Sequence, residues 1–214
     1  MKILVLHIPK TGGTALSEYF VNIFGDKSFG TSHTPEVRNA FNNYKDNILR
    51  DYSYVTGHNP LSSVKDSIRQ FDFVISVIRD PISRLISHCN YIDKLDFPSF
   101  FRENFLSNVA TRNEQCGYVG LHNTFNSVLE ALETYPNLVL FRHDRLESGF
   151  KDFCIKNNLG NGELRQVNVT KNKLISHTDI GSDVGGVLCK WFYDDFLLHS
   201  YLLNEGKDYV GGNL

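Results

Sequence analysis

The sequence predicts a three-layer α/β fold with a mainly parallel central sheet. Three observations support this: short aliphatic runs typical of buried strands, amphipathic helical stretches between them, and a glycine-containing turn directly after the first run. Strands are predicted near residues 2–8, 52–56, 72–78 and 137–141. The length of 214 residues fits one domain, 1–214, with room for a hydrophobic core.

The first strand, residues 2–8, leads into the turn Pro9-Lys10-Thr11-Gly12-Gly13-Thr14. Apolar residues at helical spacing follow between Leu16 and Phe24, and Gly25 ends that helix. A strand, a glycine turn and a helix N-terminus form an anion site, because free N–H groups and the helix dipole favour negative charge. Lysine and threonine side chains add a cation and hydroxyl donors. The turn therefore predicts a phosphate-bearing ligand, although an ordinary strand–helix turn remains the alternative.

This turn differs from the loop that binds nucleoside triphosphates. That loop places its lysine after the glycines, whereas Lys10 precedes Gly12 and Gly13. The sequence also shows no obvious acidic residue at the end of a strand to hold magnesium. These differences count against a kinase-like phosphotransferase, which we keep as an alternative.

A second strand, residues 72–78, runs directly into Arg79. Asp80 is suited to cap a helix and Pro81 to occupy its first position. Arg79 then lies at the carboxyl end of a strand, where open α/β sheets bind ligands, and Ser87 lies about two turns into the helix. An arginine and a hydroxyl there can bind a second phosphate, since a guanidinium matches phosphate oxygens. The alternative is that Arg79 pairs with a carboxylate.

The rest of the chain predicts further elements in order. Residues 92–123 form a long connection with weak helical signals, of the kind that shapes a substrate site. Helices are expected near residues 36–49, 125–135, 145–158 and 184–203.

Five segments in order resemble the sulfotransferases that use 3′-phosphoadenosine 5′-phosphosulfate (PAPS). The two most specific are Pro9–Thr14 and Arg79-Asp80-Pro81-x-x-Arg84-x-x-Ser87. Between them, Val55–Pro60 is similar to the family's Gly-His segment, and Asn108–Arg112 and Val167–Lys171 resemble later segments. The nearest branch is that of heparan sulfate 2-O-sulfotransferase and its small bacterial relatives. The resemblance implies a P-loop-like sulfotransferase fold and a sulfotransferase activity.

The resemblance also assigns roles to residues. Arg79 and Ser87 would hold the 3′-phosphate of the cofactor. Asn168 and Lys171 would lie in a late loop near the cofactor. Family members often have serine or threonine where this chain has Ala15. The residues that would hold the 5′-phosphosulfate are Lys10, Thr11, Gly12, Gly13 and Thr14.

The expected chemistry is in-line transfer of a sulfuryl group, leaving 3′,5′-bisphosphoadenosine. Lys10 is the candidate that stabilises charge on the leaving oxygen, so no metal is needed. His58 is the candidate base, because it follows a strand and a histidine titrates in the useful range. His33 and Arg112 are candidates for the acceptor site. Neither His-x-x-x-His nor Cys-x-x-Cys occurs, so we expect no zinc.

Composition limits the partners. A formal net charge of −2 argues against a broad surface that binds nucleic acid, and no apolar run is long enough for a membrane span. We expect a cytoplasmic enzyme with four dispersed free thiols and a carbohydrate or other small hydroxylated acceptor. The oligomeric state is not predicted. A nucleotide-binding protein without catalysis is the second alternative.

Overall fold

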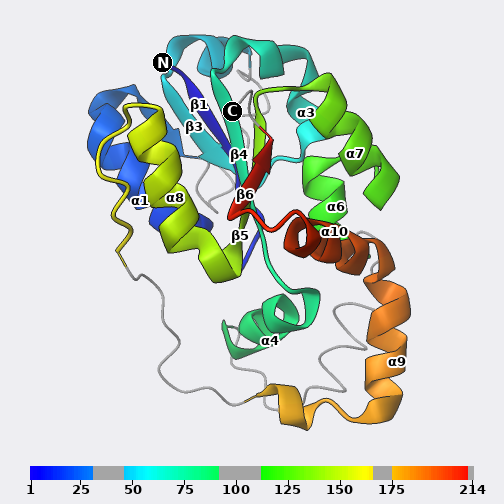
Figure 1. Cartoon of the computed structure of the whole chain (residues 1–214). Helices are drawn as coiled ribbons and strands as arrows, with labels where there is room; N and C mark the ends of the chain where they lie inside the picture. Colours follow the sequence, from blue (N-terminus) through cyan, green and yellow to red (C-terminus); the bar gives the residue numbers. More distant parts are fainter. Residues whose placement is uncertain (31–45, 92–111, 166–174, 212–214) are drawn as a thin grey trace.

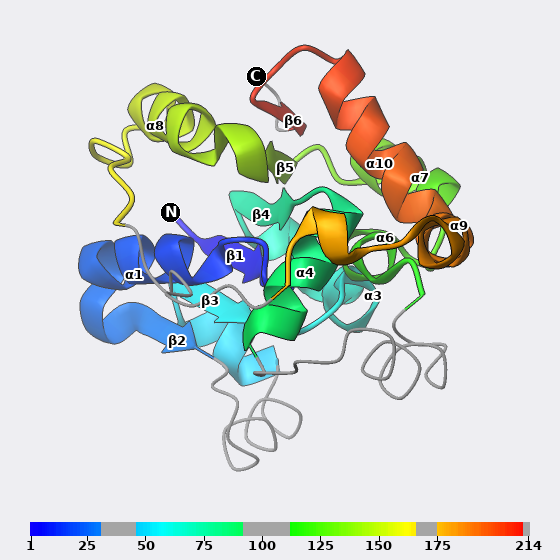
Figure 2. The same ribbon diagram turned by 90° about the horizontal axis from the view of Figure 1, so that it is seen from below.

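A computed structural model describes residues 1–30, 46–91, 112–165 and 175–211. Six strands form one sheet in the order β2-β3-β1-β4-β5-β6, which Figure 2 shows from the carboxyl edge. All neighbouring pairs are parallel except β5 with β6. The strands are β1 (Ile3–Leu6), β2 (Ser28–Gly30), β3 (Tyr54–Gly57), β4 (Phe73–Ile78), β5 (Leu138–Arg142) and β6 (Tyr209–Gly211). The four predicted strands are confirmed, whereas β2 and the antiparallel β6 were not predicted.

Helices cover both faces of this sheet, which gives the three predicted layers (Figure 1). On one side lie α1 (Gly13–Phe24) and α8 (Leu146–Lys156). The other side is covered by α3 (Leu61–Val64), α6 (Glu114–Val119), α7 (Phe125–Thr134) and α10 (Tyr193–Asn204). Shorter 3₁₀ turns are η1 (Gly25–Lys27), η2 (Lys65–Gln70), η5 (His143–Arg145) and η6 (His177–Asp179).

The two faces of β1 show how the sequence builds these layers. Ile3 and Val5 are buried against α1 and α8, while Leu4 and Leu6 are buried on the opposite side. Side chains alternate across a strand, so an uninterrupted aliphatic run fills two cores at once. This explains why β1 has no polar face.

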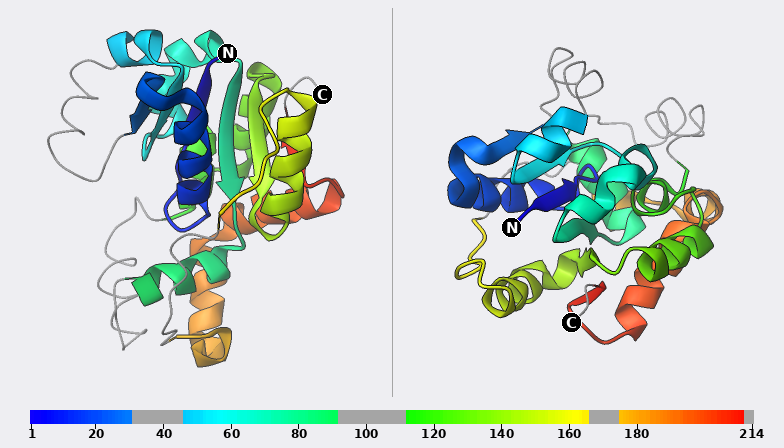
Figure 3. Two further views of the ribbon diagram at one scale, coloured as in Figure 1. Left: turned by 90° about the vertical axis from the view of Figure 1, so that its left-hand side faces the viewer. Right: turned by 90° about the horizontal axis from the view of Figure 1, so that it is seen from above.

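Two further helices, α4 (Pro81–Tyr91) and α9 (Ser182–Trp191), lie beyond the carboxyl ends of the strands (Figure 3). They share a third apolar cluster that includes Leu85 and Leu188. The carboxyl edge of the sheet is therefore bordered by helices, as Figure 2 also shows.

The predicted single helix over residues 184–203 is wrong, because the chain bends at Phe192 between α9 and α10. Leu188 and Phe192 pack in the cluster with α4, whereas Leu198 and Leu202 pack on the sheet. The apolar residues of 184–203 thus pack in two separate hydrophobic clusters, and the bend lets α9 contact one cluster and α10 the other.

The other predicted helices agree with the structure where it describes them. Helices α7 and α8 match the predictions near residues 125–135 and 145–158. The predicted helix near residues 36–49 lies mostly outside the described residues, and residues 46–51 are helical. All four cysteines are free thiols.

Candidate functional site

The predicted anion turn connects β1 to α1. Gly12 precedes the helix with a φ of +97°, a conformation that glycine adopts without strain. A β-carbon on Gly12 would lie 3.0 Å from Leu146 and 3.5 Å from the His143 ring. A β-carbon on Gly13 would clash with the His7 ring. Neighbouring side chains therefore leave no room for a side chain at either position, which explains why both residues are glycine.

Lys10 occupies the middle of this turn in a left-handed conformation, with a φ of +68°. This conformation is unfavourable for a lysine, so the surrounding turn must hold it. Its ammonium lies 4.0 Å from the centre of the Tyr91 ring, a cation–π distance. Burial and the nearby Arg79 guanidinium both lower the pKa of Lys10. An anion placed here would relieve the repulsion between the two cations.

The two threonines of the turn differ in their surroundings. Thr11 is buried, and its hydroxyl donates a hydrogen bond of 2.9 Å to the carbonyl of Ile8. This bond closes the turn from inside, so Thr11 would meet a ligand through its backbone N–H. Thr14 is half-buried in the first turn of α1.

Arg79 lies directly after β4, as predicted, and its side chain reaches the anion turn. Its guanidinium donates a hydrogen bond of 3.0 Å to the carbonyl oxygen of Lys10. Burial lowers the pKa of Arg79, and the guanidinium of Arg84 adds to this shift, while Asp80 opposes it. The structure therefore brings the two predicted cations together at one edge of the sheet.

Helix α4 begins as the sequence predicted. The Asp80 carboxylate accepts a hydrogen bond of 2.7 Å from the N–H of Ser83, which caps the helix. Ser87 is half-buried, two turns into the helix.

Arg84, on the same helix, contacts the backbone of the anion turn. It is buried, donates a hydrogen bond of 3.2 Å to the carbonyl of Pro9, and forms an ion pair of 2.5 Å with Glu114. Burial and the charge of Arg84 lower the pKa of the neighbouring His88. These contacts give Arg84 a structural function that spacing alone did not reveal.

His58 follows β3, and its Nδ1 lies 2.6 Å from the carbonyl oxygen of His7. Because a carbonyl only accepts hydrogen bonds, Nδ1 carries the hydrogen, and Nε2 is the basic nitrogen of the neutral ring. The two histidine rings contact each other, with their centres 4.6 Å apart. Since His7 also packs on Gly13, the candidate base is linked to the anion turn through one side chain.

His143 is a residue of this site that the sequence analysis did not single out. It follows β5 directly, and its ring lies beside Gly12 of the turn. Burial and the charge of Arg79 lower the pKa of His143 to about 4, so the ring is neutral near pH 7. Its position after a predicted strand, like those of His58 and Arg79, is the signal that could have found it.

The remaining predicted residues are placed only in part. His33, Asn168 and Lys171 lie outside the described residues. Arg112 is exposed just before α6, and its carbonyl accepts a hydrogen bond from Asn123.

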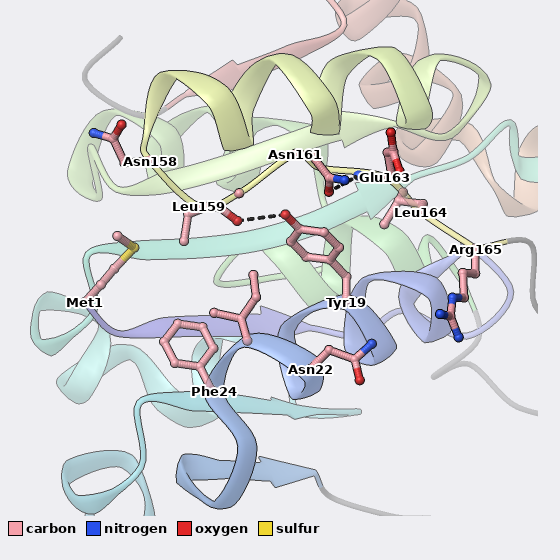
Figure 4. A pocket seen from close by; sticks show the side chains of 12 residues that line it. Met1, Tyr19, Asn22, Phe24, Asn158, Leu159, Asn161, Glu163, Leu164 and Arg165 are labelled. Carbon is pink, nitrogen blue, oxygen red and sulfur yellow. Dashed lines mark hydrogen bonds between the residues drawn. The ribbon is translucent and has the colours of Figure 1, made fainter.

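A separate pocket of about 750 Å³ lies between α1 and the segment after α8 (Figure 4). Tyr19 borders it and donates a hydrogen bond of 2.7 Å to the carbonyl of Leu159. None of the candidate site residues lines this pocket. Across the described ranges, no cluster of three or more histidine, cysteine or acidic side chains is arranged to hold a metal ion.

A sequence model described as the sulfotransferase family matches residues 1–161. The chain belongs to the sulfotransferase family. This match confirms the resemblance to sulfotransferases over residues 1–161, three quarters of the chain. No curated protein sequence matches this sulfotransferase.

A solved structure of a sulfotransferase shares its fold. Mouse sulfotransferase SULT7A1 complexed with PAP matches with a TM-score of 0.55 and 16% identity, over 96% of this chain and 88% of the mouse protein. Retinol dehydratase complexed with androsterone and inactive cofactor PAP matches with a TM-score of 0.47 and 14% identity, over 91% and 80%. The match to the mouse enzyme confirms the predicted P-loop-like sulfotransferase fold. In the part of the chain that is described, no helix has both the length and the apolar character needed to cross a bilayer.

Proposed function

We propose that this sulfotransferase uses PAPS and transfers its sulfuryl group to an acceptor hydroxyl without a metal ion. The observation that carries the proposal is the convergence of Lys10 and Arg79 on one glycine turn. Two cations at one edge of the sheet suit a nucleotide that carries more than one phosphate group. The structurally similar mouse enzyme was crystallised with PAP, which supports the same nucleotide here.

The residues present fit such a nucleotide. Helix α1 begins at Gly13, directly after the turn, and the N-terminus of a helix favours an anion. The 3′-phosphate would be held by Arg79 and Ser87, and Asn168 and Lys171 would contact the nucleotide from the late loop. The 5′-phosphosulfate would be held by Lys10, Thr11, Gly12, Gly13 and Thr14.

PAPS, when bound, supplies a sulfuryl group whose bond to the bridging oxygen breaks as a bond to the acceptor oxygen forms. Lys10 and the N–H groups of the turn stabilise the electron pair left on the bridging oxygen. Nε2 of His58 takes the proton of the acceptor hydroxyl. The hydrogen bond from Nδ1 to the His7 carbonyl holds the ring in the tautomer that this step requires.

The acceptor is proposed to be a carbohydrate or another small hydroxylated molecule. His33 and Arg112 are the residues that we assign to its recognition. Arg112 is exposed beside α6, where it can meet an anionic group of the acceptor.

Thermal shift measurements test this proposal. 3′,5′-Bisphosphoadenosine should raise the melting temperature without magnesium, and adenosine 5′-monophosphate should raise it much less at the same concentration. Stabilisation by ATP with magnesium, and not by the bisphosphate, would instead indicate a phosphotransferase. Transfer of labelled sulfate from PAPS to a panel of hydroxylated acceptors then tests catalysis directly.

A further inference from the structure

The backbone of Arg79 is held by the side chain of one other residue, Gln115. The Oε1 atom of Gln115 accepts a hydrogen bond of 2.9 Å from the N–H of Arg79. Its Nε2 atom donates a hydrogen bond of 2.9 Å to the carbonyl of the same residue. A primary amide thus makes both hydrogen bonds that a neighbouring strand would make.

This arrangement occurs where the sheet ends. The last paired residue of β4 is Ile78, opposite Arg142 of β5. Arg79 is therefore the first residue beyond the sheet ladder. Gln115 extends the ladder by one residue, and so fixes the direction in which the Arg79 side chain leaves the backbone.

Gln115 is itself held firmly. Its side chain is fully buried, and its N–H donates a hydrogen bond of 3.2 Å to the carboxylate of Asp195. The next N–H, that of Cys116, donates to the same carboxylate at 2.8 Å. Asp195 comes from α10 and is fully buried, so the start of α6 is fixed to the body of the protein.

The first turn of α6 also holds the second arginine. Glu114 pairs with the guanidinium of Arg84, which in turn contacts the carbonyl of Pro9. Consecutive residues of one short helix thus support the anion turn and the residue that follows β4. This juxtaposition points to a function for α6 in nucleotide recognition.

We propose that Gln115 is a positioning residue that sets the preference for a nucleotide with a 3′-phosphate, by fixing the backbone from which Arg79 extends. The inference rests on the proposed function, in which Arg79 binds the 3′-phosphate. Gln115 acts only through Arg79. Loss of its two hydrogen bonds lets the backbone of Arg79 move, and the guanidinium at the end of the long side chain then no longer meets the phosphate.

The test compares two nucleotides by calorimetric titration. The measured quantity is the ratio of the dissociation constants for adenosine 5′-monophosphate and 3′,5′-bisphosphoadenosine. We expect a high ratio in the wild type and a ratio about tenfold lower in Gln115→Met, which keeps the side-chain length and removes both hydrogen bonds. Gln115→Asn keeps the amide but falls about one bond short, so it should lower the ratio similarly. It serves as the second variant if Gln115→Met does not fold.

Two comparisons separate positioning from general stability. Asn137 also donates from its side-chain amide to two backbone carbonyls, those of Ile68 and Phe71, at the other end of the sheet. Asn137→Leu should lower the melting temperature without changing the ratio. In an Arg79→Ala background, Gln115→Met should lower the ratio no further.

Each outcome has one meaning. A wild type that binds both nucleotides equally contradicts the proposed function itself. A wild type that prefers the bisphosphate, with an unchanged ratio in both Gln115 variants, overturns only the inference about Gln115. An equal fall in Asn137→Leu, or a further fall in the double variant, also overturns it.

Discussion

The guanidinium of Arg79 donates a hydrogen bond to the carbonyl oxygen of Lys10, 3.0 Å away, although 69 positions separate the two residues in the chain. The bond joins the end of β4 to the turn after β1. Only the backbone carbonyl of Lys10 takes part in this bond, whereas its ammonium lies over the ring of Tyr91. The Arg79 side chain is therefore fixed to the backbone of the turn in which the proposed nucleotide binds.

Lys10 should be essential for turnover and yet unfavourable for stability. We expect Lys10→Ala and Lys10→Gly each to lower kcat by roughly 10²–10³-fold, because both remove the cation that stabilises the leaving oxygen. Since Lys10 has a φ of +68°, the glycine variant should be more stable than the alanine variant by about 1 kcal/mol. Sulfate-transfer assays and chemical denaturation measure the two effects.

The exposed Lys27 provides the control for this pair. Lys27→Ala removes a lysine without touching the anion turn and should retain wild-type turnover. Equal stability of the alanine and glycine variants of Lys10 would contradict the strained conformation, even if both were inactive.

His58→Ala should lower kcat by about 10²–10⁴-fold, the usual contribution of a positioned base. Binding of 3′,5′-bisphosphoadenosine should change little, because His58 faces the acceptor proton in the proposed reaction. The exposed His122 is a matched control, and His122→Ala should leave both quantities unchanged. Wild-type turnover in His58→Ala would show that another group is the base.

Gly13 links the turn to the candidate base. A methyl group on Gly13 would clash with the His7 ring, which contacts the ring of His58. Gly13→Ala should therefore destabilise the fold by about 1–3 kcal/mol and also lower kcat, because His58 must shift with His7. Denaturation curves and kinetic assays on the same preparation measure both.

Gly186 is the control for that substitution. It is exposed within α9, and a β-carbon there meets no atom within 4 Å. Gly186→Ala should stabilise the protein by roughly 0.5–1 kcal/mol and leave kcat unchanged. If Gly13→Ala behaved in the same way, the contact with His7 would have no importance for the site.

The sequence could predict the centre of the sheet but not its edges. The four longer strands lie within two residues of their predicted ends, because buried parallel strands are uninterrupted aliphatic runs. Strands β2 and β6 have three residues each, too few to show a pattern. The bend at Phe192 could not be predicted, because the spacing of apolar residues does not show whether they pack in one hydrophobic core or in two.

Some residues of the candidate site could likewise be predicted from the sequence, and others could not. Lys10, His58 and Arg79 could be found because each follows a predicted strand, and the carboxyl ends of parallel strands meet at one edge. The functions of Arg84 and Gln115 depend on where α6 lies. That position is set by Asp195, about 80 residues later in the chain, and no local pattern reports it.

His143 should make stability depend on pH. Its pKa falls from an ordinary value of 6.5 to about 4 in the folded state, through burial and the charge of Arg79. Between these values the unfolded chain binds a proton that the folded protein does not, so the free energy of unfolding falls as the pH drops from about 6.5 to 4. Full stability is present above 6.5. The expected loss is about 1–3 kcal/mol, since the ring retains some access to solvent.

Asp195 changes the free energy of unfolding in the opposite direction over the same pH range. Burial raises its pKa to about 6, so the folded protein binds a proton there that the unfolded chain does not. The effect of His143 must therefore be measured as a difference between wild type and His143→Gln, which cannot titrate. We expect the wild type to lose stability relative to this variant as the pH falls from 6.5 to 4, and the difference to be constant from pH 7 to 8. Urea denaturation at each pH gives these values. A difference that stays constant down to pH 4 would mean that His143 titrates alike in the folded and unfolded protein, and that neither burial nor the charge of Arg79 lowers its pKa.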